Sequence, residues 1–125
     1  MNKLALHTEQ APQPVGVYSQ AIRAGNTVYL SGQLGINPTG SELQPDFAIQ
    51  ARQMFCNLRA VCQAAGGDLS NIVRLGVYLT DMADFPTLNQ IMSEYFTAPY
   101  PARSVVQVVA LPKAGVVEAD AIMVI

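Results

Sequence analysis

The sequence predicts one α+β domain in which two helices cover one face of a mixed sheet. Half of its 125 residues are hydrophobic, which is enough for a core and too many for a disordered chain. Two stretches carry apolar residues at three- and four-residue steps, the spacing of an amphipathic helix. Short β-prone runs precede, separate and follow these stretches. With no internal repeat and no linker, residues 1–125 are expected to form a single domain.

The first strands of the expected sheet lie in the run SQAIRAGNTVYLSGQLG at 19–35. Its two β-prone halves meet at Gly25 and Asn26, residue types that supply the positive φ of a tight turn. The run therefore predicts a hairpin. A further strand is predicted at 71–80, because apolar residues alternate there onto one face. These residues are Val73, Leu75, Val77 and Leu79.

Each helix is predicted from an apolar stripe that starts behind an aspartate. Asp46 precedes the first stripe and Asp84 the second, and aspartate is a favoured residue at a helix N-cap. Gly66 and Gly67 are expected to end the first helix. The first stripe comprises Phe47, Ala51, Met54, Phe55, Leu58, Cys62 and Ala65. The second comprises Leu88, Ile91, Met92, Tyr95 and Phe96.

Charge, hydropathy and cysteine spacing exclude several classes of protein. The net charge is −2 and no basic run is present, so no nucleic-acid or anionic-membrane partner is predicted. No stretch approaches the roughly 18 unbroken apolar residues of a membrane span. Cys56 and Cys62 fall six residues apart in one helix, which directs their thiols to different faces and argues against a disulfide or a two-cysteine metal site. A cytoplasmic location is expected.

The last two strands are predicted at 103–111 and 116–125, with apolar residues on both faces. Two helices can cover only one face of a sheet, so the other face is expected to pack against a second copy of the chain. A polar cluster is predicted on that second face, where a seam between subunits would form a ligand pocket. Its members are Arg103, Gln107, Glu118 and Asp120, with Tyr29 and Ser31 as candidate neighbours.

Four segments, in order and with matching spacing, resemble the RidA family, also called the YjgF/YER057c/UK114 family. They are APQPVGVYSQA at 11–21, LSGQLG at 30–35, VYLTDMADFPTLN at 77–89 and YPARSVVQV at 100–108. The resemblance implies a chorismate-mutase-like fold and a homotrimer with pockets at its subunit interfaces. It also implies hydrolysis of 2-imino acids and their enamine tautomers, such as 2-aminoacrylate, to 2-ketoacids and ammonia, without a metal or other cofactor.

The resemblance further implies which residues form the pocket. Arg103 would bind the substrate carboxylate, and a planar guanidinium does match a carboxylate with two hydrogen bonds. Asp120 and Tyr18 are implied as catalytic groups, with Asp120 in the place of a family glutamate. Glu118 is a second carboxylate on the same face that could compensate for the shorter Asp120. The remaining implied positions are Ser31, Gly32, Asn89 and Val105, the last in the place of a family cysteine.

The sequence leaves alternatives open. Arg103 could form an interface ion pair with Asp120 or Glu118. Tyr18 could be a packed aromatic residue, and Asn89 could face solvent on its helix. The alternative function is a non-catalytic protein that binds small 2-ketoacids or related carboxylates and acts as a metabolic regulator. RNA cleavage or translation inhibition, also linked to the resembled family, is disfavoured by the acidic balance of the chain.

Overall fold

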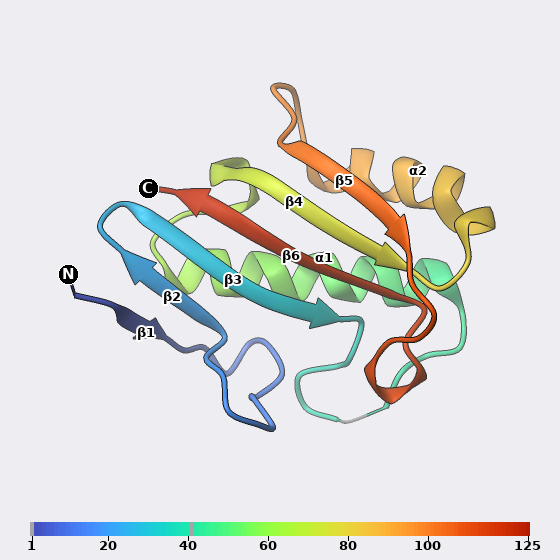
Figure 1. The fold of residues 1–125 in the computed structure, drawn as a ribbon, viewed down its shortest axis with the longest axis horizontal. Coiled ribbons are helices and arrows are strands. Elements are labelled where there is room, and N and C mark those ends of the chain that lie inside the picture. Colours follow the sequence, from blue (N-terminus) through green and yellow to red (C-terminus); the bar gives the residue numbers. More distant parts are fainter. Residues whose placement is uncertain (1, 41) are drawn as a thin grey trace.

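The structure is a computed structural model that describes residues 2–40 and 42–125. Within these residues six strands form one sheet in the order β1-β2-β3-β6-β4-β5 (Figure 1). Every neighbouring pair is antiparallel except β4 and β5, so the sheet is mixed, as predicted. The strands are β1 (Leu4–Leu6), β2 (Ala21–Ala24), β3 (Thr27–Leu34), β4 (Ile72–Leu79), β5 (Ala102–Gln107) and β6 (Val117–Val124).

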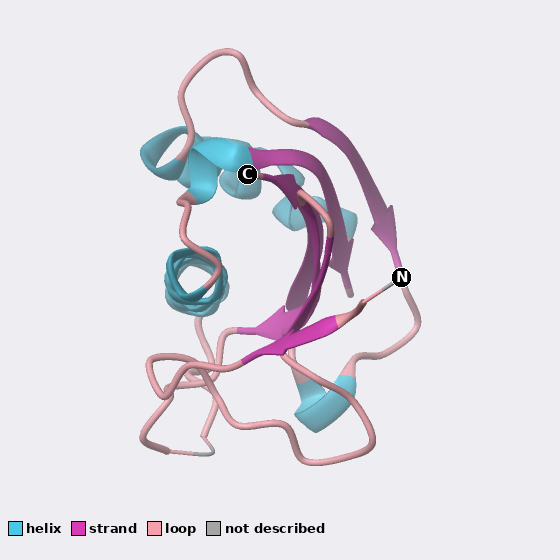
Figure 2. Cartoon of the chain, turned by 90° about the vertical axis from the view of Figure 1, so that its left-hand side faces the viewer, coloured by secondary structure: helices cyan, strands magenta, loops and turns pink. Residues whose placement is uncertain are grey.

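Two α-helices, α1 (Phe47–Ala64) and α2 (Phe85–Tyr95), lie on one side of the sheet (Figure 2). Three short 3-10 turns complete the described chain. They are η1 (Leu69–Asn71), η2 (Met82–Asp84) and η3 (Pro112–Ala114). The core lies between the helices and the sheet, and both predicted apolar stripes face it. Its largest fully buried side chains include Phe55, Met54, Leu58, Leu75, Leu79 and Leu88.

The structure confirms the predicted glycine end of α1, but the aspartate predicted to cap α2 does not do so. Gly66 has φ +91°, and the N–H of Gly67 donates to the carbonyl of Cys62 at 3.0 Å, so the glycines end α1 as predicted. Asp84 precedes α2 but has helical backbone angles and makes no capping hydrogen bond. Asp81 caps the turn before it instead, with Oδ1 accepting from the N–H of Ala83 at 2.9 Å.

The predicted hairpin forms between β2 and β3. Gly25 has the expected positive φ of 63°, whereas Asn26 does not adopt a positive φ. The cysteines of α1 face different ways as predicted, because Cys56 is exposed and Cys62 is buried. None of the described helices is long and apolar enough to cross a membrane.

Two predicted strands need correction. In β4 a register shift between Ile72 and Arg74 turns Ile72 inward and leaves Val73 49% exposed, so Val73 does not belong to the core face. The strand predicted at 103–111 ends at Gln107, because its only partner strand in the described sheet, β4, ends at Leu79, which pairs with Gln107. Beyond it the chain leaves the sheet, and Val109 is fully exposed.

A further strand, β1, was not predicted. Its three residues pair with β2 and are exposed or half-buried. A strand this short and this poorly buried carries little of the alternating pattern that sequence analysis relies on. It extends the sheet at the edge opposite β5 (Figure 1).

Candidate active site

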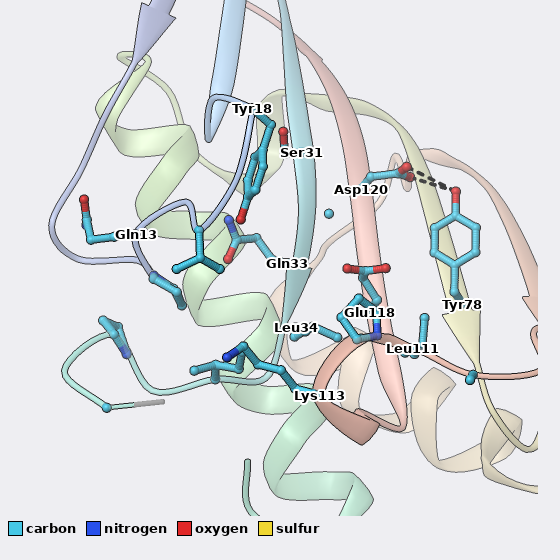
Figure 3. Close-up of a pocket in the computed structure, with 18 of the residues that line it drawn as sticks. Gln13, Tyr18, Ser31, Gln33, Leu34, Tyr78, Leu111, Lys113, Glu118 and Asp120 are labelled. Atoms are coloured by element: carbon cyan, nitrogen blue, oxygen red, sulfur yellow. Dashed lines mark hydrogen bonds between the residues drawn. The ribbon is translucent and has the colours of Figure 1, made fainter. Parts of the chain in front are cut away.

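Two carboxylates lie on the face of the sheet that the helices leave open. Glu118 and Asp120 are two residues apart on β6, so their side chains share one face. Glu118 pairs with Tyr78 of β4, and Asp120 pairs with Gly76 of the same strand. Both carboxylates line a cavity of about 1040 Å³ (Figure 3). Its other polar lining residues include Gln13, Tyr18, Ser31, Gln33, Thr39, Tyr78 and Lys113.

Glycines on the two neighbouring strands make room for these carboxylates. A Cβ atom at Gly32 on β3 would lie 2.9 Å from Oε2 of Glu118. A Cβ atom at Gly76 on β4 would lie 2.5 Å from Oδ1 of Asp120. Real Cβ atoms essentially never approach another atom closer than 3.0 Å. Each carboxylate therefore occupies space that any other residue type at the glycine position would fill.

The pKa values of Glu118 and of the neighbouring Tyr78 are both raised. Burial, followed by the neighbouring charge of Asp120, raises the pKa of Glu118 above its usual value. Burial also raises the pKa of Tyr78, with a further contribution from Asp120. Among the described residues that line the cavity, Lys113 is the only lysine or arginine. The cavity therefore combines a glutamate of raised pKa with a single lysine among its described lining residues.

Tyr18 and Ser31 both line the cavity, and the long loop before β2 carries Tyr18. Tyr18 is 51% exposed. The hydroxyl of Ser31 donates to the carbonyl of Ser19 at 2.6 Å, and its N–H donates to the carbonyl of Gln20 at 3.0 Å. Ser31 thus fixes the end of the loop that presents Tyr18. Figure 3 shows Tyr18, Ser31 and Glu118 among the residues that line the cavity.

A buried glutamine fixes the rest of this loop. Gln20 is 2% exposed, and its Nε2 donates to the carbonyls of Thr8 at 3.0 Å and Pro12 at 2.9 Å. Its Oε1 accepts from the N–H of Thr8 at 2.8 Å. One side chain thereby satisfies three backbone groups of a segment without regular structure. The loop is consequently held in place although it packs little apolar surface.

Arg103 lies on the other face, so the prediction that it shares one face with Glu118 and Asp120 is wrong within a single chain. It pairs with Leu75 in the parallel β4–β5 ladder, and Leu75 is fully buried under the helices. Gln107 likewise pairs with Leu79 and accepts a hydrogen bond from the N–H of Met82 at 2.9 Å. The sequence offered no register for this edge strand, and a shift of one residue reverses every side chain.

Asn89 and Phe85 hold the Arg103 side chain against α2. Nη1 of Arg103 donates to Oδ1 of Asn89 at 2.7 Å and contacts Sδ of Met92 at 3.4 Å. Its guanidinium carbon lies 5.5 Å from the centre of the Phe85 ring. The Asn89 side chain therefore contacts Arg103, so it does not simply face solvent on its helix. Nε and Nη2 make no hydrogen bond to any residue that the structure describes.

Residues 2–40 and 42–125 contain two ion pairs, and neither includes Arg103. They join Arg52 to Glu94 at 2.9 Å and Arg59 to Asp68 at 3.7 Å. Val105 follows Arg103 on the helix side of β5, opposite the buried Val77. The predicted residues thus form two groups in one chain. Tyr18, Ser31, Gly32 and Asp120 surround the cavity, whereas Arg103, Asn89 and Val105 lie at the β5 edge.

Tyr78 and Lys113 line the cavity but were not predicted as site residues from the sequence. The apolar alternation around Tyr78 is typical of a core strand. Only the pairing of Tyr78 with Glu118 shows that its side chain faces the cavity. Lys113 has a φ of 57°, as does Ala114, in the η3 turn that follows the apolar run. A proline before Lys113 and a glycine after Ala114 signal a turn at this point. Nothing in that signal shows that the turn borders a cavity.

The fold and this cavity define an α+β domain with an acidic cavity on the open face of its mixed sheet. The family model described as Endoribonuclease L-PSP matches residues 8–125, so the chain belongs to that family. It is 44% identical to 2-iminobutanoate/2-iminopropanoate deaminase of Dermatophagoides farinae over 98% of this chain and 97% of that protein.

Solved structures agree with this assignment. The crystal structure of RidA from an Antarctic Psychrobacter species has 51% sequence identity and a TM-score of 0.96, covering 98% of this chain and 99% of that one. Its name confirms the resemblance to the RidA family. The structure of Escherichia coli TdcF with bound serine has 37% identity and a TM-score of 0.94, with 98% of both chains covered.

Proposed function

We propose that this chain is a hydrolytic deaminase that converts small 2-imino acids and their enamine tautomers, including 2-aminoacrylate, to 2-ketoacids and ammonia. The observation that carries the proposal is the carboxylate pair of Glu118 and Asp120 in a cavity bordered by Ser31 and Gly32. The name of the deaminase relative, nearly half identical over its whole length, supports the same reaction. It agrees with the deaminase-like hydrolase that the sequence predicts.

Imine hydrolysis needs a proton on nitrogen and a water oxygen on carbon, and the two carboxyl groups can divide this work. Asp120 takes a proton from water as the oxygen bonds to the imine carbon, while the C=N π electrons move to nitrogen, which takes the proton of neutral Glu118. The carbinolamine hydroxyl then returns a proton to Glu118 as the C–N bond breaks. Ammonia leaves with the proton held by Asp120, and both groups are restored.

Other cavity residues orient the substrate and the carbinolamine formed from it. Tyr18 lines the same cavity as the carboxylates, where its hydroxyl can donate a hydrogen bond to the carbinolamine oxygen. Ser31 and Gly32 form the floor on β3. The raised pKa of Glu118 favours the proton-carrying form that the first step requires.

The substrate carboxylate requires a cation, and we propose Arg103, supplied by a second copy of the chain. Within one chain Arg103 lies across the sheet from the cavity, with Nε and Nη2 unbonded to described residues. Asn89 and Phe85 already hold the side chain, so little of its conformational freedom remains to be lost on binding. Each chain would then contribute an arginine half-site and a carboxylate half-site. A closed ring of such contacts gives the trimer that the sequence resemblance implies.

The chain is accordingly expected to be a homotrimer in solution. The open face exposes large apolar side chains, among them Tyr29, Val106 and Val124, and apolar patches of this kind mark subunit contacts. Sedimentation equilibrium at micromolar concentration should give about three times the 13.4 kDa of one chain. A monomer at that concentration would contradict both the trimer and the shared site.

Gly32→Ala is expected to lower turnover by about tenfold or more while the melting temperature changes little. The added methyl group would meet the end of the flexible Glu118 side chain, which can rotate away without straining the backbone. The carboxyl group would then point elsewhere in the cavity. Turnover and thermal melting of this variant give the check, and full activity would show that the observed position of Glu118 is not needed.

The alternative function, a non-catalytic protein for small 2-ketoacids or related carboxylates, uses the same residues. The serine bound to E. coli TdcF supports a small carboxylate as ligand and does not distinguish the two functions. A coupled assay does distinguish them. An amino-acid oxidase generates imino acids in place, and ketoacid formation above the uncatalysed rate with the chain present supports the enzyme. Tight ketoacid binding without acceleration would instead favour the regulator.

RNA cleavage, which the name of the family suggests, finds less support in this site. The cavity presents Glu118 and Asp120 against a single lysine, and carboxylates repel the phosphates of a nucleic acid. The net charge of −2 offers no compensating attraction. We therefore propose a small-molecule substrate and no nucleic-acid partner.

A further inference from the structure

Tyr78 holds one of the two carboxylates by hydrogen bonds from the neighbouring strand. Its hydroxyl lies 3.1 Å from Oδ2 and 3.3 Å from Oδ1 of Asp120 (Figure 3). The hydroxyl thus faces both oxygens of the carboxylate and restricts rotation about the last side-chain bond. Glu118 receives no such contact from a described side chain. The two carboxylates therefore differ in how firmly they are held.

Gly76 lies between Tyr78 and Asp120 in space, and its lack of a side chain makes their contact possible. A Cβ atom at Gly76 would lie 2.5 Å from Oδ1 of Asp120 and 3.1 Å from the Tyr78 hydroxyl. The pair therefore closes over a position where β4 carries no side chain. Tyr78 and Asp120 also line a second cavity of about 330 Å³ that includes Arg74 and Tyr29. They form the boundary between this cavity and the larger one.

We propose that Tyr78 is a positioning residue that fixes the Asp120 carboxylate toward the water that attacks the imine carbon. This inference rests on the deaminase activity proposed above. Asp120 is one methylene shorter than a glutamate, so its reach depends on a single orientation. A hydroxyl that bonds both oxygens supplies that orientation from a strand that is itself hydrogen-bonded on both sides.

The charged and titratable groups around Asp120 come from five parts of the fold: the loop before β2, the strands β3, β4 and β6, and the η3 turn. Glu118, on the same strand, carries a pKa that burial and the Asp120 charge raise. Tyr78 has a raised pKa for the same two causes, opposed by Arg74. The complete set of such groups lining the two cavities is Tyr18, Tyr29, Arg74, Tyr78, Lys113 and Glu118. Only Tyr78 among them bonds directly to Asp120.

The test compares Tyr78→Phe with Tyr95→Phe, each of which removes one hydroxyl group. Tyr95 lies on α2, where its hydroxyl is 3.7 Å from Sγ of Cys56, so it controls for the loss of a partly buried hydroxyl away from the cavity. Tyr78→Phe should lower kcat about tenfold with little change in KM. Tyr95→Phe should match the wild type. A matching loss of kcat in both variants would overturn the positioning role.

A double-mutant cycle shows whether Tyr78 acts through Asp120. Tyr78→Phe should have no further effect on kcat in an Asp120→Asn background, because the oriented carboxylate is already gone. The full tenfold loss in that background would overturn the inference and leave the deaminase proposal standing. No turnover by the wild-type chain would overturn the deaminase proposal and the catalytic role of Tyr78 together.

An ultraviolet titration reports the contact without activity. The difference between wild type and Tyr78→Phe isolates the ionisation of Tyr78, whose pKa is raised by burial and then by Asp120. In Asp120→Asn that pKa should fall toward its ordinary value while part of the rise, due to burial, remains. An unchanged Tyr78 pKa in Asp120→Asn would overturn the contact on which the positioning role depends.

Discussion

Replacing Arg103 by lysine is expected to weaken 2-ketoacid binding by about 30-fold, or about 2 kcal/mol, the scale of a charge-assisted hydrogen bond. Lysine keeps the positive charge but cannot present two parallel N–H groups to a carboxylate. It also cannot keep the contact to Asn89 at 2.7 Å while it reaches a ligand. Arg103→Ala should lose at least as much affinity.

The measurement is ketoacid affinity by calorimetry, with imine turnover beside it. Arg52→Lys is the matched control, because Arg52 pairs with Glu94 on the exposed surface of the helices and should not affect the site. Its affinity is expected to equal that of the wild type. If both Arg103 variants bound ketoacid and turned over imine normally, Arg103 would not be the carboxylate-binding group.

A mixing experiment separates the shared site from a site within one chain. Subunits of Arg103→Ala carry an intact carboxylate half-site, and subunits of Asp120→Asn carry an intact arginine half-site. If the site spans two chains, mixed oligomers regain some wild-type sites and part of the turnover returns. If each chain builds its own site, mixing restores nothing. Because Arg103 and Asp120 lie on opposite faces of the sheet in one chain, we expect recovery.

The helices and the central sheet could be predicted because their patterns are long and regular. The stripe from Phe47 to Ala65 repeats over five turns, and only one arrangement buries it. The alternation of Leu75, Val77 and Leu79 likewise fixes the inward face of β4. The prediction for Val73 is wrong because a register shift at the start of the strand places its side chain on the other face. A shift of that kind cannot be recognised from the apolar pattern.

The side of the sheet on which Arg103 lies could not be predicted. Valines occupy both faces of the run after it, so the alternation gives two equivalent readings. Its pairing with β4 decides between them, and that pairing joins residues about 30 positions apart through a parallel crossover. The position of Glu118 and Asp120 on one face followed from their spacing alone. Tyr78 entered the site only through its partner on β6.

Loss of either carboxyl group is expected to lower turnover by about 10²-fold or more, the usual scale for a general acid or base. Glu118→Gln removes the proton donor, and Asp120→Asn removes the group that takes the proton of water. Both amides keep the shape of the side chain. Ketoacid affinity should stay near that of the wild type, because Arg103 supplies the carboxylate contact. Asp120→Glu should hold or raise the rate, since it lengthens the reach toward water.

Stability separates these catalytic roles from structural ones. The pKa of Glu118 is raised by burial and by Asp120, so the folded state is favoured while Glu118 is protonated and loses that contribution as the pH rises through the raised pKa. Glu118→Gln carries no charge to bury and should melt at the same or a higher temperature than the wild type at neutral pH. A lower melting temperature would assign Glu118 to stability.

The pH dependence of turnover tests which group donates the proton. If neutral Glu118 is the donor, the rate falls as the pH rises through its raised pKa. Asp120→Asn removes a charge that raises this pKa, so the fall in the residual rate should move to lower pH. Melting temperature, ketoacid affinity and pH profile of both amide variants therefore have distinct expected values. Full turnover in Asp120→Asn would remove Asp120 from the mechanism, and an unmoved pH profile would remove Glu118 as the donor.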